Sequence, residues 1–112
     1  MHTEELLHRI TRPFVLAGVY KDENAALTDI VLDYVRRKID QYDNCIIAFQ
    51  KKYDCDFDQF TERIREKASL EAEDDWMEWK GVKEMRHAWK KADKMIISSR
   101  YCEFHHQELF RI

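Results

Sequence analysis

Residues 35–53 decide the fold of this chain, and they read VRRKIDQYDNCIIAFQKKY. Apolar and aromatic side chains recur in this stretch at intervals of 4, 3, 4, 3 and 4 residues, the spacing of one face of an α-helix. The members of this row, which we call the first seam, are Val35, Ile39, Tyr42, Ile46, Phe49 and Tyr53. A row of this length predicts a helix covered by a partner helix, either from the same chain or from another copy.

The helix that carries the first seam is expected to span Glu23–Tyr53. Asp22 or Asn24 can cap its start, and neither Gly nor Pro interrupts it. Such a helix is about 45 Å long at ~1.5 Å per residue, which is longer than a compact domain of this size is wide. We therefore predict that the first seam is also the interface of a homodimer.

Two further helices are expected beyond Tyr53. Asp56 followed by Gln59 has the spacing of a capping box and predicts a helix over Asp56–Lys67. Acidic residues in a first turn favour a third helix over Asp75–Ile97, which Ser98-Ser99 would end. Its apolar row, the second seam, consists of Val82, Met85, Trp89, Ala92 and Ile96.

The ends of the chain lie outside this hairpin. Glu4–Ile10 predicts a short helix that Pro13 closes, and Phe14–Tyr20 predicts a strand or an extended arm. We therefore expect one helical domain, residues 1–112, made of an N-terminal arm (1–21), a helical hairpin (22–97) and a C-terminal tail (98–112). The predicted fold class is all-α: a long, coiled-coil-like helical hairpin with a short intervening helix, paired into a dimeric four-helix assembly.

Composition narrows the class of protein. Only 2 Gly and 1 Pro occur in 112 residues, which argues against a β-sandwich or barrel. The net charge of −3 gives no general attraction to nucleic acid. No apolar run approaches the ~20 residues of a membrane span, and the N-terminus is acidic where a secretory signal is basic. The 3 cysteines are interpreted as free thiols in the cytoplasm.

Catalytic and metal motifs are missing from the sequence. It has no Gly-rich phosphate loop, nucleophile elbow or HExxH pair, which predicts a non-enzymatic protein without a cofactor. Cys102, His105 and His106 are residue types that bind zinc, but no second pair at a familiar spacing completes four ligands. We therefore predict no metal site.

Three groups of side chains are candidates for contact with a partner. A basic stripe with helical spacing could meet an acidic partner, although a solvated helix face is the favoured interpretation; it comprises Lys80, Lys83, His87, Lys90 and Lys94. Trp76 and Trp79 fall off the second seam, so they either pack on the Asp56–Lys67 helix, which we favour, or bind a partner. The tail aromatics Tyr101, Phe104 and Phe110 are predicted to bind a partner.

Two stretches carry a family resemblance. Gly18-Val19-Tyr20 followed by the Asp22–Leu27 segment resembles the turn into a helix of small prokaryotic antitoxins. The segment Glu73–Trp79, EDDWMEW, after a long Tyr/Phe-rich helix, is similar to helical bacterial and archaeal proteins described as antitoxin partners of small toxins. This resemblance covers roughly residues 14–97. It implies neutralisation of a toxin by protein contact, and it departs from ribbon-helix-helix antitoxins because too few residues precede Gly18.

The sequence therefore predicts a protein–protein interaction module, with an antitoxin as its specific form. Its apolar and aromatic helix surfaces would cover the functional surface of the partner. A structural homodimer without a toxin partner is the alternative.

Overall fold

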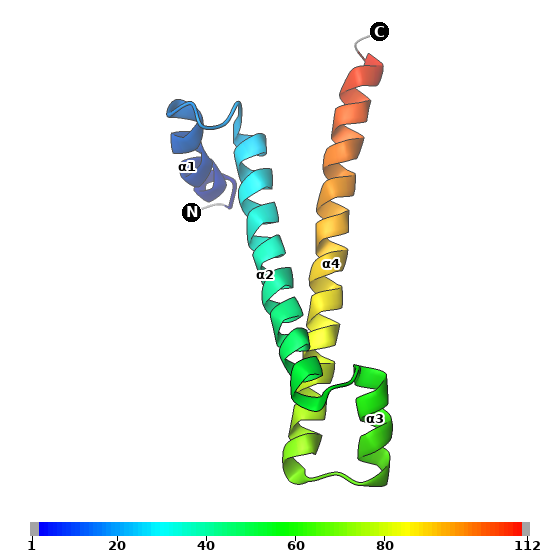
Figure 1. Ribbon diagram of the computed structural model, residues 1–112. Helices are drawn as coiled ribbons and strands as arrows, with labels where there is room; N and C mark the ends of the chain where they lie inside the picture. Colours follow the sequence, from blue (N-terminus) through cyan, green and yellow to red (C-terminus); the bar gives the residue numbers. More distant parts are fainter. Residues whose placement is uncertain (1–2, 111–112) are drawn as a thin grey trace.

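Four helices form the chain, in a computed structural model that describes residues 3–110 and the side chains of residues 3–98 (Figure 1). They are α1 (Thr3–Leu16), α2 (Glu23–Tyr53), α3 (Phe57–Glu66) and α4 (Leu70–Phe110). No strand occurs among residues 3–110. The predicted all-α hairpin with a short intervening helix is therefore confirmed. Within the same residues, no helix has the length and apolar character that crossing a bilayer requires.

The two long helices α2 and α4 run antiparallel, close together at one end and apart at the other (Figure 1). We call the end that holds α3, the last turns of α2 and the first turns of α4 the closed end. The opposite end, where α1 folds back along α2, is the open end. The molecule measures 63 × 35 × 24 Å with a radius of gyration of 20.7 Å, against about 13 Å for a compact domain of this length. It is therefore elongated.

The starts of α2 and α3 follow the sequence signals. Asp22 caps α2 by accepting a hydrogen bond from the Ala25 amide at 2.7 Å. Asp56 and Gln59 form the predicted capping box, each side chain accepting from the other's backbone N–H at 2.8 and 3.1 Å. Between the two helices, Asp54 turns the chain with a left-handed φ of 53°. The predicted helix over Glu23–Tyr53 is confirmed, and so is the capping box.

Helix α4 is longer than predicted at both ends. Ser69 caps it, accepting from the Ala72 amide at 3.1 Å, so the helix begins at Leu70 rather than Asp75. The prediction that Ser98-Ser99 ends the helix is wrong, since α4 continues to Phe110. Serine weakens a helix only slightly, and no Gly or Pro follows to stop it. The backbone of the predicted tail is thus helical up to Phe110.

The predicted N-terminal helix over Glu4–Ile10 is confirmed as part of α1, but its predicted end at Pro13 and the strand or extended arm predicted after it are wrong. Helix α1 passes through Pro13 to Leu16, and no strand or extended arm follows it. The helix stops at Gly18 instead, whose φ of +79° is readily adopted only by glycine. The Gly18 amide donates to the Val15 carbonyl and the Val19 amide to the Phe14 carbonyl, at 3.0 and 2.9 Å. These two bonds form a Schellman motif, a stronger stop signal here than proline.

Candidate functional site

An aromatic cluster at the closed end joins three helices. Trp79 of α4 is its centre and is 0% exposed. Its ring stacks on Phe49 of α2 at 5.4 Å and on Phe60 of α3 at 5.5 Å, and Phe57 meets it edge-on at 5.5 Å. Tyr53 continues the cluster, with its ring 4.1 Å from that of Phe60. Aromatic pairs at these distances stabilise a fold beyond their buried area, so this cluster is the main packing centre of the described chain.

The second tryptophan packs on α3. The indole Nε1–H of Trp76 donates to the Thr61 hydroxyl at 2.9 Å, and its ring stacks on Phe57 at 5.8 Å. Thr61 in turn donates to the Phe57 carbonyl at 2.8 Å, so the hydroxyl is held in place. Both Trp76 and Trp79 therefore lie against α3, the placement expected of core packing rather than of an exposed surface for a partner.

The first seam lies on the side of α2 that meets α4 of the same chain. Val35 is buried, and the other five members are partly buried. Phe49 stacks on Trp79, and the Tyr53 hydroxyl donates to the Asp75 carboxylate. Helix α4 thus covers the seam that we predicted as a dimer interface, while its role between two copies stays a prediction.

The prediction of the second seam is wrong at Met85, whose side chain is 46% exposed. It also leaves out Trp79, which is buried. The row of α4 that meets α2 is spaced 3, 4, 3, 4 and 3 residues apart and consists of Trp79, Val82, Arg86, Trp89, Asp93 and Ile96. Two of its positions are charged. Arg86 pairs with Asp43, and Asp93 accepts from Arg36 at 3.3 Å. Because these two positions are charged, apolar spacing alone does not identify them, and the predicted row is turned around the axis of α4 relative to the row that meets α2.

A polar cluster ties the end of α2 to the start of α4. Lys52 Nζ lies 2.7 Å from an Asp75 carboxylate oxygen and 3.0 Å from that of Glu71, and Tyr53 donates to the same Asp75 oxygen as Lys52. Hydrogen bonds from Lys52 and Tyr53 lower the pKa of Asp75. Bonds to Asp75 and Glu71 raise the pKa of Lys52, and partial burial with the Asp75 bond raises that of Tyr53. Each group therefore keeps one protonation state near neutral pH.

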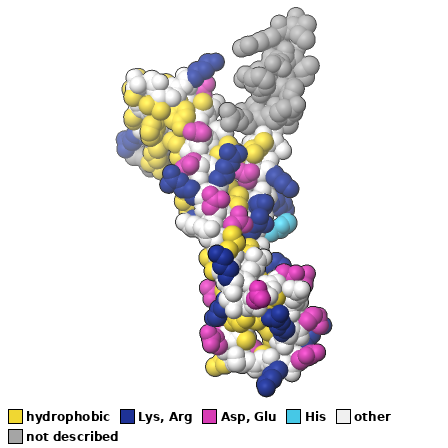
Figure 2. Space-filling model, viewed as in Figure 1, with side chains coloured by type: hydrophobic (Ala, Val, Ile, Leu, Met, Phe, Trp, Pro, Cys, Tyr) yellow, Lys and Arg dark blue, Asp and Glu magenta, His cyan; other side chains and the backbone are white. Residues whose placement is uncertain are grey.

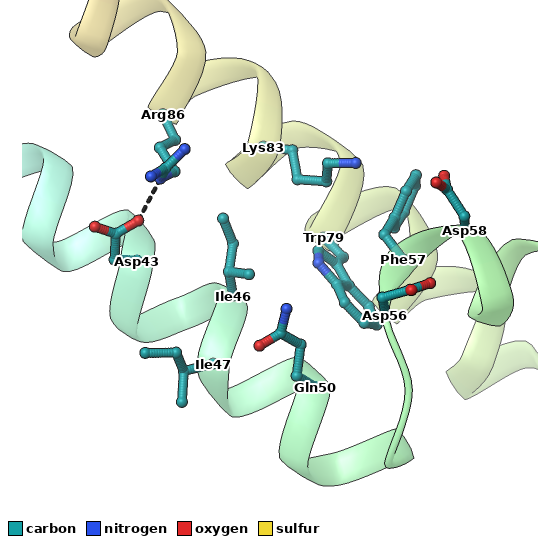
Figure 3. A pocket seen from close by; sticks show the side chains of 10 residues that line it. All are labelled: Asp43, Ile46, Ile47, Gln50, Asp56, Phe57, Asp58, Trp79, Lys83 and Arg86. Carbon is teal, nitrogen blue, oxygen red and sulfur yellow. Dashed lines mark hydrogen bonds and ion pairs between the residues drawn. The ribbon is translucent and has the colours of Figure 1, made fainter.

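A groove runs beside the aromatic cluster between α2, α3 and α4 (Figure 3). Its volume is about 490 Å³, and its lining comprises Asp43, Ile46, Ile47, Gln50, Asp56, Phe57, Asp58, Trp79, Lys83 and Arg86. The Arg86–Asp43 ion pair closes one end, and Lys83 lies 4.3 Å from the centre of the Phe57 ring. The Trp79 Nε1–H is buried beside the groove with no hydrogen-bond partner. That nitrogen has almost no exposed surface, so the groove offers a mixed apolar and charged wall rather than a donor that a small ligand reaches.

The open end exposes most of the large apolar side chains that the structure leaves in solvent. On α1, the buried Thr11 faces α2, while the apolar row of the helix is turned partly outward. The exposed apolar residues of this end are Leu6, Leu7, Ile10, Phe14, Leu16, Val19, Ile30, Val31, Tyr34, Met95 and Ile97. Figure 2 shows the apolar surface gathered over α1 and the adjoining part of α2.

Three contacts hold α1 and the turn that follows it against the start of α2. His8 Nδ1 lies 2.6 Å from the Glu23 carboxylate, and the Tyr20 hydroxyl donates to Asp29. The bond to Asp29 raises the pKa of Tyr20. Phe14 packs edge-on against Tyr20 with the ring centres 6.2 Å apart. The half-exposed apolar row of α1 therefore lies on a helix whose position is held by contacts with α2.

The basic stripe is exposed along α4 at every one of its five positions. Two of its lysines already serve the fold, because Lys80 lies 5.5 Å from the Trp76 ring centre and Lys83 packs over Phe57. The tail residues Tyr101, Phe104 and Phe110 have side chains outside the described residues, as do Cys102, His105 and His106. Among the described residues, no group of three or more His, Cys, Asp or Glu side chains is arranged to hold a metal ion.

Sequence reasoning missed the open end as a candidate surface. The signal was present, because Leu6, Ile10 and Phe14 are spaced by four residues, but Pro13 was interpreted as a break between them. Comparison with known proteins adds no constraint: no family model, curated protein or solved structure matches this chain.

Proposed function

We propose that this chain is a non-enzymatic protein-interaction module whose open end binds an apolar helical surface of a partner protein. The observation that carries this proposal is the apolar surface over α1 and the first half of α2 (Figure 2). Monomeric proteins rarely expose large contiguous apolar patches unless those patches bind something. The proposed compartment is the cytoplasm, where Cys45 and Cys55 would stay free thiols, as they are here.

The form of the open end supports a helix as the bound element. Helices α2 and α4 diverge there, and α1 packs on α2, whereas α3 contacts both long helices at the closed end through Phe57 and Phe60 (Figure 1). Tyr34 on α2, whose ring meets Trp89 of α4 at 5.8 Å, is 54% exposed, and Ile97 further along α4 is 42% exposed. A partner helix that lies along α1 and α2 would cover apolar rows by the same ridge-and-groove packing that joins α2 to α4.

The polar groups support a non-catalytic role. An acid–base catalyst needs a pKa near the working pH. In the Lys52–Tyr53–Asp75 cluster each pKa is shifted away from neutrality, downward for the aspartate and upward for the other two. This cluster is suited to joining two helices, not to moving protons.

Toxin neutralisation is the narrower form of the proposal. Its support is the resemblance of residues 18–27 and 73–79 to antitoxin sequences, together with the tight turn from Gly18 to the Asp22 cap that leads into α2. In this form the partner is a small toxin whose active surface the open end covers. A structural homodimer with no toxin partner is the alternative.

The test is capture of a partner by the tagged full chain, compared between two matched variants. The double substitution Leu6→Glu with Ile10→Glu places charges in the open-end surface, at positions already about half exposed. Ile47→Glu is the control, since Ile47 is exposed to a similar degree but lies by the groove at the closed end. We expect capture of the co-expressed product of a neighbouring gene to be lost only in the double variant.

Equal capture by both variants would contradict the open end as the binding surface. For the narrower proposal, growth of cells that express the captured protein is the readout. Co-expression of the wild-type chain should restore growth, and co-expression of the double variant should not. Growth that is unaffected by the captured protein alone would remove the antitoxin form of the proposal.

A further inference from the structure

Helix α4 has a second apolar row, on the face turned away from both α2 and α3. Leu70, Asp74, Met77, Gly81, Met85 and Ala88 make up this outer row, which is apolar at every position except Asp74, and Ala92 and Met95 continue it toward the open end. At about 100° per residue, its members lie within a narrow sector of the helix, and the sector is well separated from Trp76 and Trp79. Met77 is 68% exposed and Met85 46%, although methionine is a residue that cores and apolar interfaces usually bury. Nothing in the described chain covers this row.

Gly81 stands at the middle of the outer row. A Cβ atom at this position would meet nothing within 4 Å, so the packing of the chain itself does not require a glycine there. Glycine is a poor helix former, and in a helix interior it commonly marks a place where another backbone approaches closely. The two methionines flank Gly81 symmetrically, four residues before and four residues after it.

A row of charges borders the outer row on one side. Glu73, Lys80, Glu84 and Lys91 are all exposed, and none forms an ion pair among the described side chains. The sign alternates along the helix from negative to positive. Read in the opposite direction, the row has the opposite sign at each position. It is therefore complementary to a second copy of itself laid antiparallel.

We propose that the outer row binds a second copy of this chain, antiparallel, across a two-fold axis at Gly81. Met77 of one copy then packs against Met85 of the second copy, and the two glycines let the backbones approach at the axis. On the flank, Glu73 pairs with Lys91 of the second copy and Lys80 with Glu84 of the second copy. Two-fold symmetry repeats each contact, as in isologous dimers generally.

The paired length is sufficient for a specific helix interface. The overlap runs from residue 70 to residue 92, about 34 Å at ~1.5 Å per residue. Alternating charges beside an apolar row set the orientation of paired helices, because a register shift brings like charges together. The dimer leaves the first seam and the open end untouched, so it stands or falls independently of the proposed partner-binding role.

The apolar part is tested by sedimentation equilibrium of the full chain at concentrations up to about 200 μM, high enough to populate a dimer whose dissociation constant is in the micromolar range. The wild type should show a monomer–dimer equilibrium. Met77→Glu should weaken dimerisation by roughly tenfold or more. Ile97→Glu is the control, because Ile97 is also exposed (42%) but lies on the opposite side of α4 and beyond the overlap, and it should leave the dimer unchanged. Circular dichroism checks that helix content is retained.

The charged flank is tested by reversal and exchange. Glu84→Lys sets lysines against each other across the axis and should weaken the dimer. The exchange variant Lys80→Glu with Glu84→Lys restores opposite charges and should recover most of the affinity. Lys90→Glu, a charge reversal on the opposite side of α4, should have no comparable effect. A chain that stays monomeric, a dimer insensitive to Met77→Glu, or an exchange variant no tighter than Glu84→Lys alone would each overturn the proposal.

Discussion

The closed and open ends of this molecule are built from the same kind of amphipathic helix, yet they bury their apolar side chains to very different extents. At the closed end, α2, α3 and α4 converge on the fully buried Trp79. At the open end, α1 and α2 pair in the same way, but α4 has diverged (Figure 1). The apolar row of Leu6, Ile10 and Phe14 on α1 remains partly in solvent.

The difference shows that a helix packed against both α2 and α4, and not a more apolar sequence, determines whether a row is buried here. Two helices bury one row each, whereas three helices enclose a centre. Large aromatic side chains contribute most at such a centre because they contact all the surrounding elements at once. Stability should therefore reside at the closed end and partner contact at the open end.

The largest expected effect is a loss of stability when the side chain at the centre of the closed end is removed. Trp79→Ala should destabilise the fold by about 3–5 kcal/mol, because it leaves a cavity among the rings of Phe49, Phe57 and Phe60. Trp89→Ala is the matched control, since Trp89 is only partly buried and meets Tyr34 edge-on at 5.8 Å. Urea unfolding followed by circular dichroism compares the two. An equal or greater loss from Trp89→Ala would reverse the assignment of the stable end.

Substitution of the two glycines by alanine should change the free energy of unfolding by smaller amounts, and the two changes should have opposite signs. Gly18→Ala puts a side chain at a φ of +79°, a conformation that costs roughly 1–2 kcal/mol in an L-residue. Gly81→Ala lies in open space inside a helix and should stabilise the monomer by about 0.5–1 kcal/mol. Thermal unfolding at a low concentration, where the chain is monomeric, measures both. Destabilisation by Gly81→Ala under those conditions would mean that the chain itself packs against this position.

The smallest expected effect is the pH dependence of the polar cluster at the closed end. The pKa of Asp75 lies below its ordinary value of 3.8, so its contribution is present above that value and is lost as the pH falls through the lower folded pKa. The pKa values of Tyr53 and Lys52 lie above 10.0 and 10.5, so their contribution is lost as the pH rises through the folded values.

Asp75→Asn should therefore flatten both limbs of the stability–pH profile. Asp74→Asn, one residue away on an exposed position, serves as its control. Urea midpoints measured between about pH 3 and pH 11 compare the acid limb and the start of the alkaline limb. Unchanged limbs in Asp75→Asn would show that the cluster does not link the ends of α2 and α4.

The sequence predicted those elements whose signals are local. The Asp22 cap, the Asp56–Gln59 capping box and the uninterrupted helix Glu23–Tyr53 all depend on neighbouring residues, and all are confirmed. Pro13 misled the prediction for α1, because a proline was weighed as a stop while the actual stop is the Schellman turn at Gly18. A local rule failed there because two local signals competed.

The candidate surfaces depended on tertiary arrangement and were harder to predict. The row of α4 that meets α2 includes Arg86 and Asp93, whose partners Asp43 and Arg36 lie far away in the sequence. These charged residues can be assigned to the row only when the pairing between α2 and α4 is known. For the same reason the prediction placed Met85 on the face of α4 toward α2, and the outer row, to which Met85 belongs, was not predicted. The exposure of the apolar row of α1 likewise depends on which helices pack beside it, and residue spacing does not encode that.

Native-state hydrogen exchange of the free chain tests the central claim most directly, because it measures local stability along the sequence. Amides of α3, of the last turns of α2 and of the first turns of α4 should exchange most slowly, near the rate set by global unfolding. Those of α1 and of the first turns of α2 should exchange faster, as expected of a surface that still lacks its partner. Equal protection at both ends, or slower exchange in α1 than around Trp79, would contradict the account.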